Sequence, residues 1–198
     1  MFRRNPEYES EEMDKTLALK WLNQWLNITG GKKKLRNLPD NIEKFFKRNN
    51  NYTKLYRGLS FTDSMISKYL HTLTEMDTKK YKVGDYIPIK LTELTSWTAI
   101  YDFAANYADS YRHDYLEQFK KDLYENYKKD TIYGIILQLE NVKRYSVLAD
   151  VDKTFESDDN NEIILYPGTF RCKIIKVYKN GKEQESLTFD LEKYNSID

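Results

Sequence analysis

Two hydrophobic patterns follow one another along this chain, a helical one first and a strand-like one later. Over residues 17–28 the apolar side chains recur every three or four positions, which predicts a helix with one apolar face. Gly30 and Gly31 are expected to end it, because glycine tolerates the left-handed conformation beyond a helix terminus. Further helices are predicted after Pro39, over 61–73 and over 99–129.

The second half of the chain changes to apolar runs and period-two alternation, which are typical of strands. Pro88 favours an edge strand, and Asn180-Gly181 predicts a hairpin turn. The order of helices first and mostly antiparallel strands later predicts an α+β fold, with a helical lobe over 1–50 and one compact unit over 51–198. The expected strands are 54–59, 86–89, 94–98, 132–139, 145–148, 162–166, 170–177 and 187–191.

Charge and cysteine content narrow the class of protein. Among 198 residues, 32 Lys and Arg oppose 31 Asp and Glu, which argues against a generally basic nucleic-acid coat but leaves a local basic run over 31–50. Cys172 is the single cysteine and lies in an apolar strand, so it is expected to be a core residue. The two histidines, His71 and His113, are assigned surface or capping roles. Without an apolar run of about 20 residues or a secretory signal, a cytoplasmic protein that does not cross a membrane is expected.

Three short segments do not look like ordinary core. Arg57 is followed by Gly58 at the end of an apolar strand, where a guanidinium can bind a phosphate and glycine allows close backbone approach. Ser96 and Thr98 share one face of a short strand, because side chains alternate along it. Glu162 begins an apolar strand after an acidic loop and before a Pro-Gly turn. Each signal is weak alone, since arginines, threonines and glutamates at strand ends commonly face solvent.

In this order, the three segments resemble the Arg-Ser-Glu signature of the mono-ADP-ribosyltransferases, in the branch of arginine-modifying toxins and small bacteriophage enzymes. The resemblance covers about residues 50–195 and implies a split antiparallel β-sandwich with an N-terminal helical lobe and NAD in the cleft between the sheets. It implies that Glu162 stabilises the charge that develops on the ribose, that Ser96 orients Glu162, and that Arg57 binds the NAD phosphates.

The resemblance also assigns the surroundings of these three residues. No metal is expected, because nicotinamide leaves as a neutral group. Ser96 also contacts NAD in this scheme, and the loop 151–161 contacts the acceptor. The implied NAD contacts further include Gly58, Thr98 and Tyr107, and the implied acceptor contacts are Phe155, Asp158, Asp159 and Asn160.

Asn160 departs from the family pattern, which has Glu or Gln two residues before the catalytic Glu. The resemblance therefore supports NAD cleavage and transfer more firmly than it supports arginine as the target. A protein acceptor is favoured, in the setting of a toxin or host-modifying effector, which leaves open an antitoxin or immunity partner. ADP-ribosylation of a nucleic-acid base, plain NAD hydrolysis and a catalytically inactive binding module of the same fold are the alternatives.

Overall fold

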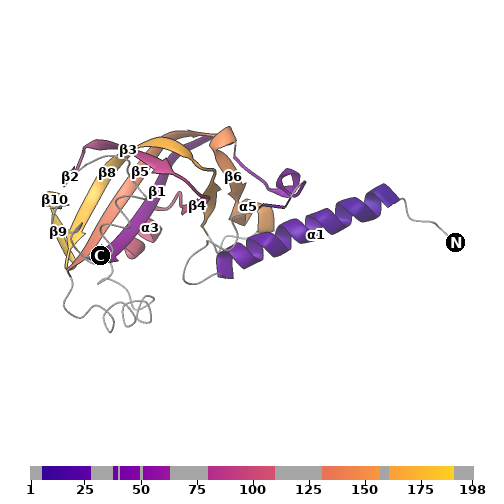
Figure 1. The fold of residues 1–198 in the computed structure, drawn as a ribbon, viewed down its shortest axis with the longest axis horizontal. Helices are drawn as coiled ribbons and strands as arrows, with labels where there is room; N and C mark the ends of the chain where they lie inside the picture. The colour runs from indigo at the N-terminus through magenta and orange to yellow at the C-terminus, as the bar shows by residue number, and fades with distance from the viewer. Residues whose placement is uncertain are drawn as a thin grey trace, which may run out of the picture.

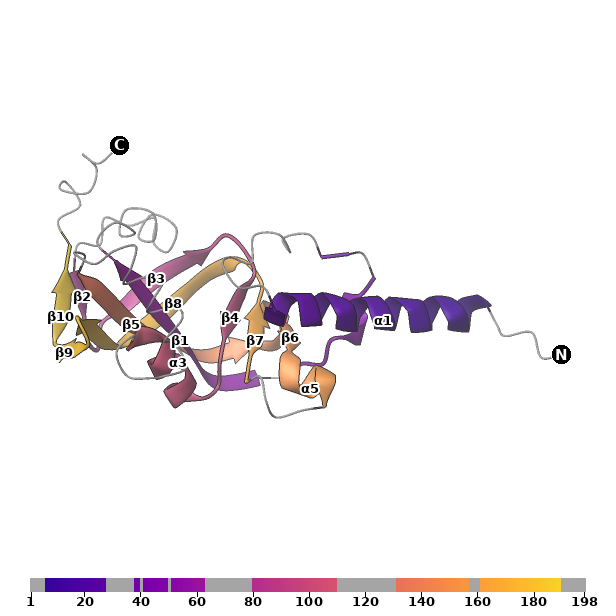
Figure 2. The ribbon, with the colours of Figure 1, turned by 90° about the horizontal axis from the view of Figure 1, so that it is seen from below.

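One long helix and three antiparallel sheets make up most of the described chain (Figures 1 and 2). The computed structural model describes residues 6–27, 38–39, 41–49, 51–62, 80–109, 131–156 and 161–189. Every strand pair in it is antiparallel, and the protein is α+β as the sequence predicts.

The large sheet contains the longest strands. Its order is β1-β5-β8-β3, with β9 added beside β8. Pro88 lies in β3 at the sheet edge, as predicted, where a missing N–H costs no ladder bond. Asn180 and Gly181 join β8 to β9 with φ angles of 49° and 72°, which confirms the predicted hairpin turn. The strands are β1 (Asn51–Thr62), β3 (Tyr86–Leu91), β5 (Ile132–Lys143), β8 (Gly168–Lys179) and β9 (Lys182–Gln184).

Two smaller sheets complete the β structure. A three-stranded sheet has the order β4-β7-β6, and β10 pairs with β2 at the other end of the molecule. A backbone bridge between Tyr56 of β1 and Thr98, just after β4, joins the three-stranded sheet to the large one through hydrogen bonds of 2.7 and 2.9 Å. The strands are β2 (Lys80–Lys82), β4 (Thr95–Trp97), β6 (Val147–Asp150), β7 (Ile163–Leu165) and β10 (Ser186–Thr188).

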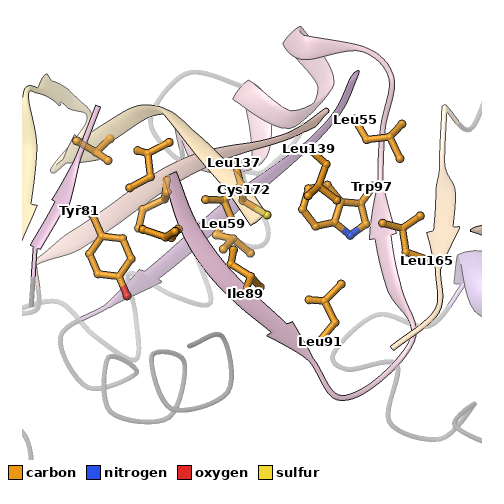
Figure 3. Packing of buried hydrophobic residues seen from close by; sticks show 14 of the residues in the cluster. Leu55, Leu59, Tyr81, Ile89, Leu91, Trp97, Leu137, Leu139, Leu165 and Cys172 are labelled. Carbon is orange, nitrogen blue, oxygen red and sulfur yellow. The ribbon is translucent and has the colours of Figure 1, made fainter. Parts of the chain in front are cut away.

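The main hydrophobic core lies between the large sheet and the inner faces of β4 and β7 (Figure 3). Leu55 and Leu59 enter it from β1, and Trp97 and Leu165 enter it from β4 and β7. Cys172 is fully buried there, and burial raises the pKa of its thiol to about 12. The thiol is therefore a core group, as predicted.

A second cluster joins the N-terminal helix α1 (Pro6–Asn27) to the three-stranded sheet. The residues that α1 contributes to this cluster follow the predicted three- and four-residue spacing. The helix itself begins at Pro6, well before the expected start. Neither α1 nor any other helix in the described ranges is long and apolar enough to cross a membrane. The cluster contains Ala18, Trp21, Leu22, Trp25, Ile42 and Phe46 packed against Leu148, Ala149, Val151 and Ile164.

Several predicted elements differ from the observed ones. Phe61 was expected to open a helix, but it is a buried residue of β1, because pairing with β5 continues to Thr62 and its ring stacks on that of Tyr133 at 5.8 Å between centroids. The helix expected after Pro39 is only the short 3-10 turn η2 (Glu43–Phe45). Tyr145 lies in another such turn, η5 (Arg144–Ser146), and not in a strand.

Other expectations fall partly or wholly outside the described residues. Of the helix expected over 99–129, the structure describes α3 (Tyr101–Ala108). The rest of that segment beyond Asp109 lies outside the described ranges, as do residues 63–79 and therefore both His71 and His113.

Two glycines bring α3 directly against the large sheet. A Cβ added at Gly58 of β1 would lie 1.8 Å from the carbonyl oxygen of Ala104, and one added at Gly134 of β5 would lie 2.0 Å from that of Ala108. Neither distance is compatible with a side chain. The sequence analysis assigned Gly58 to close approach of a ligand, whereas the structure shows that helix packing alone requires glycine there.

Replacing Gly58 with alanine is therefore expected to destabilise the fold. The added methyl group must displace the α3 backbone, so the free energy of unfolding should fall by at least about 1–3 kcal/mol. Urea unfolding followed by circular dichroism measures the change. Gly168→Ala is the matched control: its new Cβ meets only the Phe170 ring, at 3.3 Å, and should change the stability by less than about 1 kcal/mol. Equal stabilities for the two variants would contradict the packing role of Gly58.

Candidate active site

The carboxylate of Glu162 lies where three parts of the fold meet. Glu162 directly precedes β7, and β7 pairs with β4 so that Ile164 is opposite Ser96. Residues opposite each other in a ladder share a face, and so do residues two apart along a strand. Ser96 and Glu162 consequently lie on the same face, and the Ser96 hydroxyl donates a hydrogen bond to Oε1 of Glu162. The structure thus brings together two of the residues that the sequence singled out.

Trp25 supplies a second donor to the same carboxylate. The indole Nε1–H of this α1 residue donates to Oε1 of Glu162 at 2.6 Å, across 137 positions of sequence. The Trp25 side chain is only 1% exposed. Sequence analysis placed Trp25 on the apolar face of a helix and gave it no role at the site. The only feature of the sequence that points to such a role is that a buried indole N–H needs a hydrogen-bond acceptor.

Tyr107 lies within electrostatic range of Glu162. The pKa of its phenol is raised, first by partial burial and second by the negative charge of Glu162. Tyr107 is on the last turn of α3 and is 55% exposed, and its ring lies 6.3 Å from that of Phe103. An accessible aromatic surface therefore lies within electrostatic range of the carboxylate.

Arg57 lies next to β4 on the face that carries Trp97. Its guanidinium carbon is 6.0 Å from the centre of the Trp97 ring, and its positive charge partly opposes the rise in the Cys172 pKa. Because neighbouring side chains on a strand point to opposite faces, Ser96 lies on the other face of β4. Ser96 therefore contacts Glu162 directly, whereas Arg57 lies at the opposite face of β4 from Ser96.

Thr98 and Gly58 have structural roles, because both help to position α3. The backbone of Thr98 forms the bridge to Tyr56, and its hydroxyl accepts a hydrogen bond from the backbone N–H of Ile100 at 3.1 Å, immediately before α3. Thr98 is 6% exposed. Together with Gly58 beneath Ala104, it holds α3, and so Tyr107, beside the site.

A cavity of about 480 Å³ opens beside Glu162. Its wall includes the carboxylates Asp150, Asp152 and Glu156 as well as Glu162, against one ammonium group, that of Lys153. The excess of carboxylates makes this cavity favourable for a cationic group and unfavourable for a phosphate.

Two of these carboxylates also hold the wall in place. Asp150 accepts a hydrogen bond from the Tyr52 hydroxyl at 2.8 Å and caps the helix α5 (Val151–Phe155) through the backbone N–H of Lys153. Asp152 accepts from the backbone N–H of Asn161, the residue before Glu162, at 2.7 Å. Asp150 has no role in the prediction from sequence, and Asp152 enters it only as part of the segment 151–161, which is predicted to be a loop but begins with the helix α5.

The predicted acceptor residues are only partly described. Phe155 is half-buried and packs against the α1 cluster, which limits the surface that it can offer to an acceptor. Asp158, Asp159 and Asn160 lie outside the described residues. Within the described part of the chain, no group of three or more His, Cys, Asp and Glu side chains is arranged to hold a metal ion.

Comparison of the chain with protein-family models, curated proteins and solved structures finds no match. The site is therefore characterised by its own geometry. That geometry is a part-buried carboxylate with two donors on one oxygen, an exposed tyrosine within its electrostatic range and a negatively charged cavity next to it.

The proximity of Tyr107 to Glu162 can be tested by titration. Glu162→Gln removes a negative charge that opposes formation of the phenolate, so the pKa of Tyr107 should fall. It should remain above its ordinary value, because partial burial is the larger cause of the rise and stays in place.

The measurement is a pH titration of tyrosine ring carbons by NMR, with Tyr107→Phe to assign the signal. Glu183→Gln, an exposed carboxylate on β9, is the control and should leave the Tyr107 titration unchanged. An identical Tyr107 pKa in the wild type and in Glu162→Gln would refute the proposed proximity.

Proposed function

We propose that this protein is an NAD-dependent mono-ADP-ribosyltransferase with an ADP-ribosyltransferase-like split β-sandwich. The observation that carries the proposal is the hydrogen bond from Ser96 to Glu162, because the motif resemblance requires these two residues to meet although 66 positions separate them. The bridge between Tyr56 and Thr98 adds the strand of Arg57 to the same region.

The proposed reaction uses the Glu162 carboxylate to stabilise charge on the nicotinamide ribose of NAD. The bond between the ribose C1 and the nicotinamide nitrogen breaks, and nicotinamide leaves as a neutral molecule with the bonding electron pair. Positive charge develops on the ribose, where the Glu162 carboxylate stabilises it and holds the ribose hydroxyls. The acceptor's nucleophile then bonds to C1 and loses its proton.

The other NAD contacts belong to the same proposal. Arg57 binds the NAD phosphates through its guanidinium, Tyr107 packs against the nicotinamide ring, and Gly58 and Thr98 contribute backbone contacts at the junction of the two sheets. Two observations support these assignments: the charge of Glu162 contributes to the raised pKa of Tyr107, and Thr98 lies in the segment that follows Ser96.

The acceptor is proposed to be a protein side chain. The cavity beside Glu162 is lined by an excess of carboxylates, which would repel the phosphate backbone of a nucleic acid and attract a basic protein surface. Asp158, Asp159 and Asn160 are further acceptor contacts that the motif resemblance implies. We place the enzyme in a host-cell cytoplasm, as a toxin or host-modifying effector.

Glu162→Gln tests the central role. The substitution keeps the shape of the side chain and removes its charge, so release of nicotinamide from NAD should fall about 100-fold or more, while the circular dichroism spectrum stays that of the wild type. Glu183→Gln, with the same chemical change far from the site on β9, should retain wild-type activity.

The outcome also separates the alternatives. Labelled NAD incubated with a cell lysate should give a labelled product that protease removes and nuclease does not. Nuclease-sensitive label would instead identify a nucleic-acid acceptor, and nicotinamide release without label would identify a hydrolase. Equal activity of Glu162→Gln and wild type would exclude Glu162 as the catalytic carboxylate, and a wild-type protein that releases no nicotinamide would support an inactive binding module.

A further inference from the structure

Two donors to Glu162 come from different elements of the fold. Ser96 belongs to β4, within the sheet, whereas Trp25 belongs to α1, which packs over that sheet. Both bonds reach the same oxygen, Oε1. The N-terminal helix therefore contributes a polar contact to the proposed active site in addition to its hydrophobic packing.

Packing fixes the direction of the Trp25 N–H. The Trp25 ring stacks on Trp21 with centroids 5.5 Å apart and an angle of 21° between planes, and Trp21 in turn contacts Phe46 at 5.8 Å. An indole held in this way has little freedom to turn its N–H away from Glu162. The helix thus presents a preoriented donor to the carboxylate.

Comparison with Trp21 shows that this donor is specific to one position. Trp21 is also buried, at 3% exposed, and lies one helical turn earlier on the same side of α1. Its Nε1 has no hydrogen-bond partner among the described residues. Two neighbouring tryptophans therefore share the same cluster, and Trp25 is the one that donates to Glu162.

We propose that Trp25 is a positioning residue for Glu162, so that α1 is a working part of the active site and not only a separate lobe. This inference rests on the proposed function, which makes Glu162 the group that stabilises the ribose charge. One donor fixes a carboxylate oxygen at a point, but the side chain can still turn about that bond. A second donor to the same oxygen, held on a different element of the fold, restricts the turn and holds the carboxylate ready for the ribose.

A direct measurement of the bond does not depend on enzyme activity. The protein has three tryptophans, so a ¹H–¹⁵N spectrum contains three indole signals, which single Trp→Phe variants assign. Glu162→Gln replaces a charged acceptor by a neutral one, so the Trp25 indole proton should move upfield. The Trp21 and Trp97 signals should move less. A Trp25 signal that stays in place would overturn the proposal.

Kinetics then distinguish positioning from packing. Trp25→Phe keeps an aromatic ring in the cluster and removes the N–H. The kcat for nicotinamide release should fall about 10- to 100-fold, the effect of losing a hydrogen bond to a charged group, with an unchanged KM for NAD. Trp21→Phe is the matched control, because it makes the same change in the same cluster, keeps an aromatic ring beside Trp25 and removes no bond to Glu162; it should lower kcat much less than Trp25→Phe does.

The two failures can be told apart. If the wild type releases nicotinamide but Trp25→Phe keeps its kcat, or if both tryptophan variants lose kcat equally, the positioning role is wrong and the proposed function stands. If the wild type releases no nicotinamide, the proposed function is wrong, and the positioning role falls with it whatever the indole signal shows. Should Trp25→Phe fail to fold, the indole shift in Glu162→Gln still decides whether the bond exists.

Discussion

A carboxylate that is partly withdrawn from water must be surrounded by hydrogen-bond donors, and the arrangement of this fold around Glu162 satisfies that requirement. The register of β4 against β7 brings the Ser96 hydroxyl to the carboxylate. The hydrophobic cluster under α1 brings the Trp25 indole to the same oxygen. Sheet pairing and helix packing thus converge on one side chain, and a shift in either would leave a buried donor or acceptor without its partner.

A second set of contacts fixes the junction between the large sheet and the three-stranded sheet. The bridge between Tyr56 and Thr98 ties β1 to the end of β4, and the hydroxyl of Thr98 binds the chain just before α3. Gly58 and Gly134 then allow α3 to lie directly on the large sheet. A residue that resembles a ligand-binding glycine in sequence can therefore act indirectly, by setting the position of the helix that carries Tyr107.

Sequence patterns predicted the features that depend on neighbouring residues. The turn at Asn180-Gly181, the edge position of Pro88 and the burial of Cys172 follow from local chemistry and are present in the structure. Phe61 was assigned to a helix because apolar spacing in a short segment does not reveal that β5 is available to pair with it. The bond between Trp25 and Glu162 depends on how α1 packs on a distant sheet, and no local pattern encodes that.

Charge is distributed unevenly about Glu162, and the proposed reaction gives this asymmetry a meaning. Arg57 contributes positive charge on the Trp97 face of β4, whereas the cavity beside Glu162 is bordered by carboxylates. An anionic dinucleotide and a cationic acceptor would be drawn to these two different environments. The two substrates of a transfer reaction must meet at one carbon without competing for one site. Separate electrostatic environments, one at Arg57 and one in the cavity beside Glu162, would favour separate sites for the two substrates.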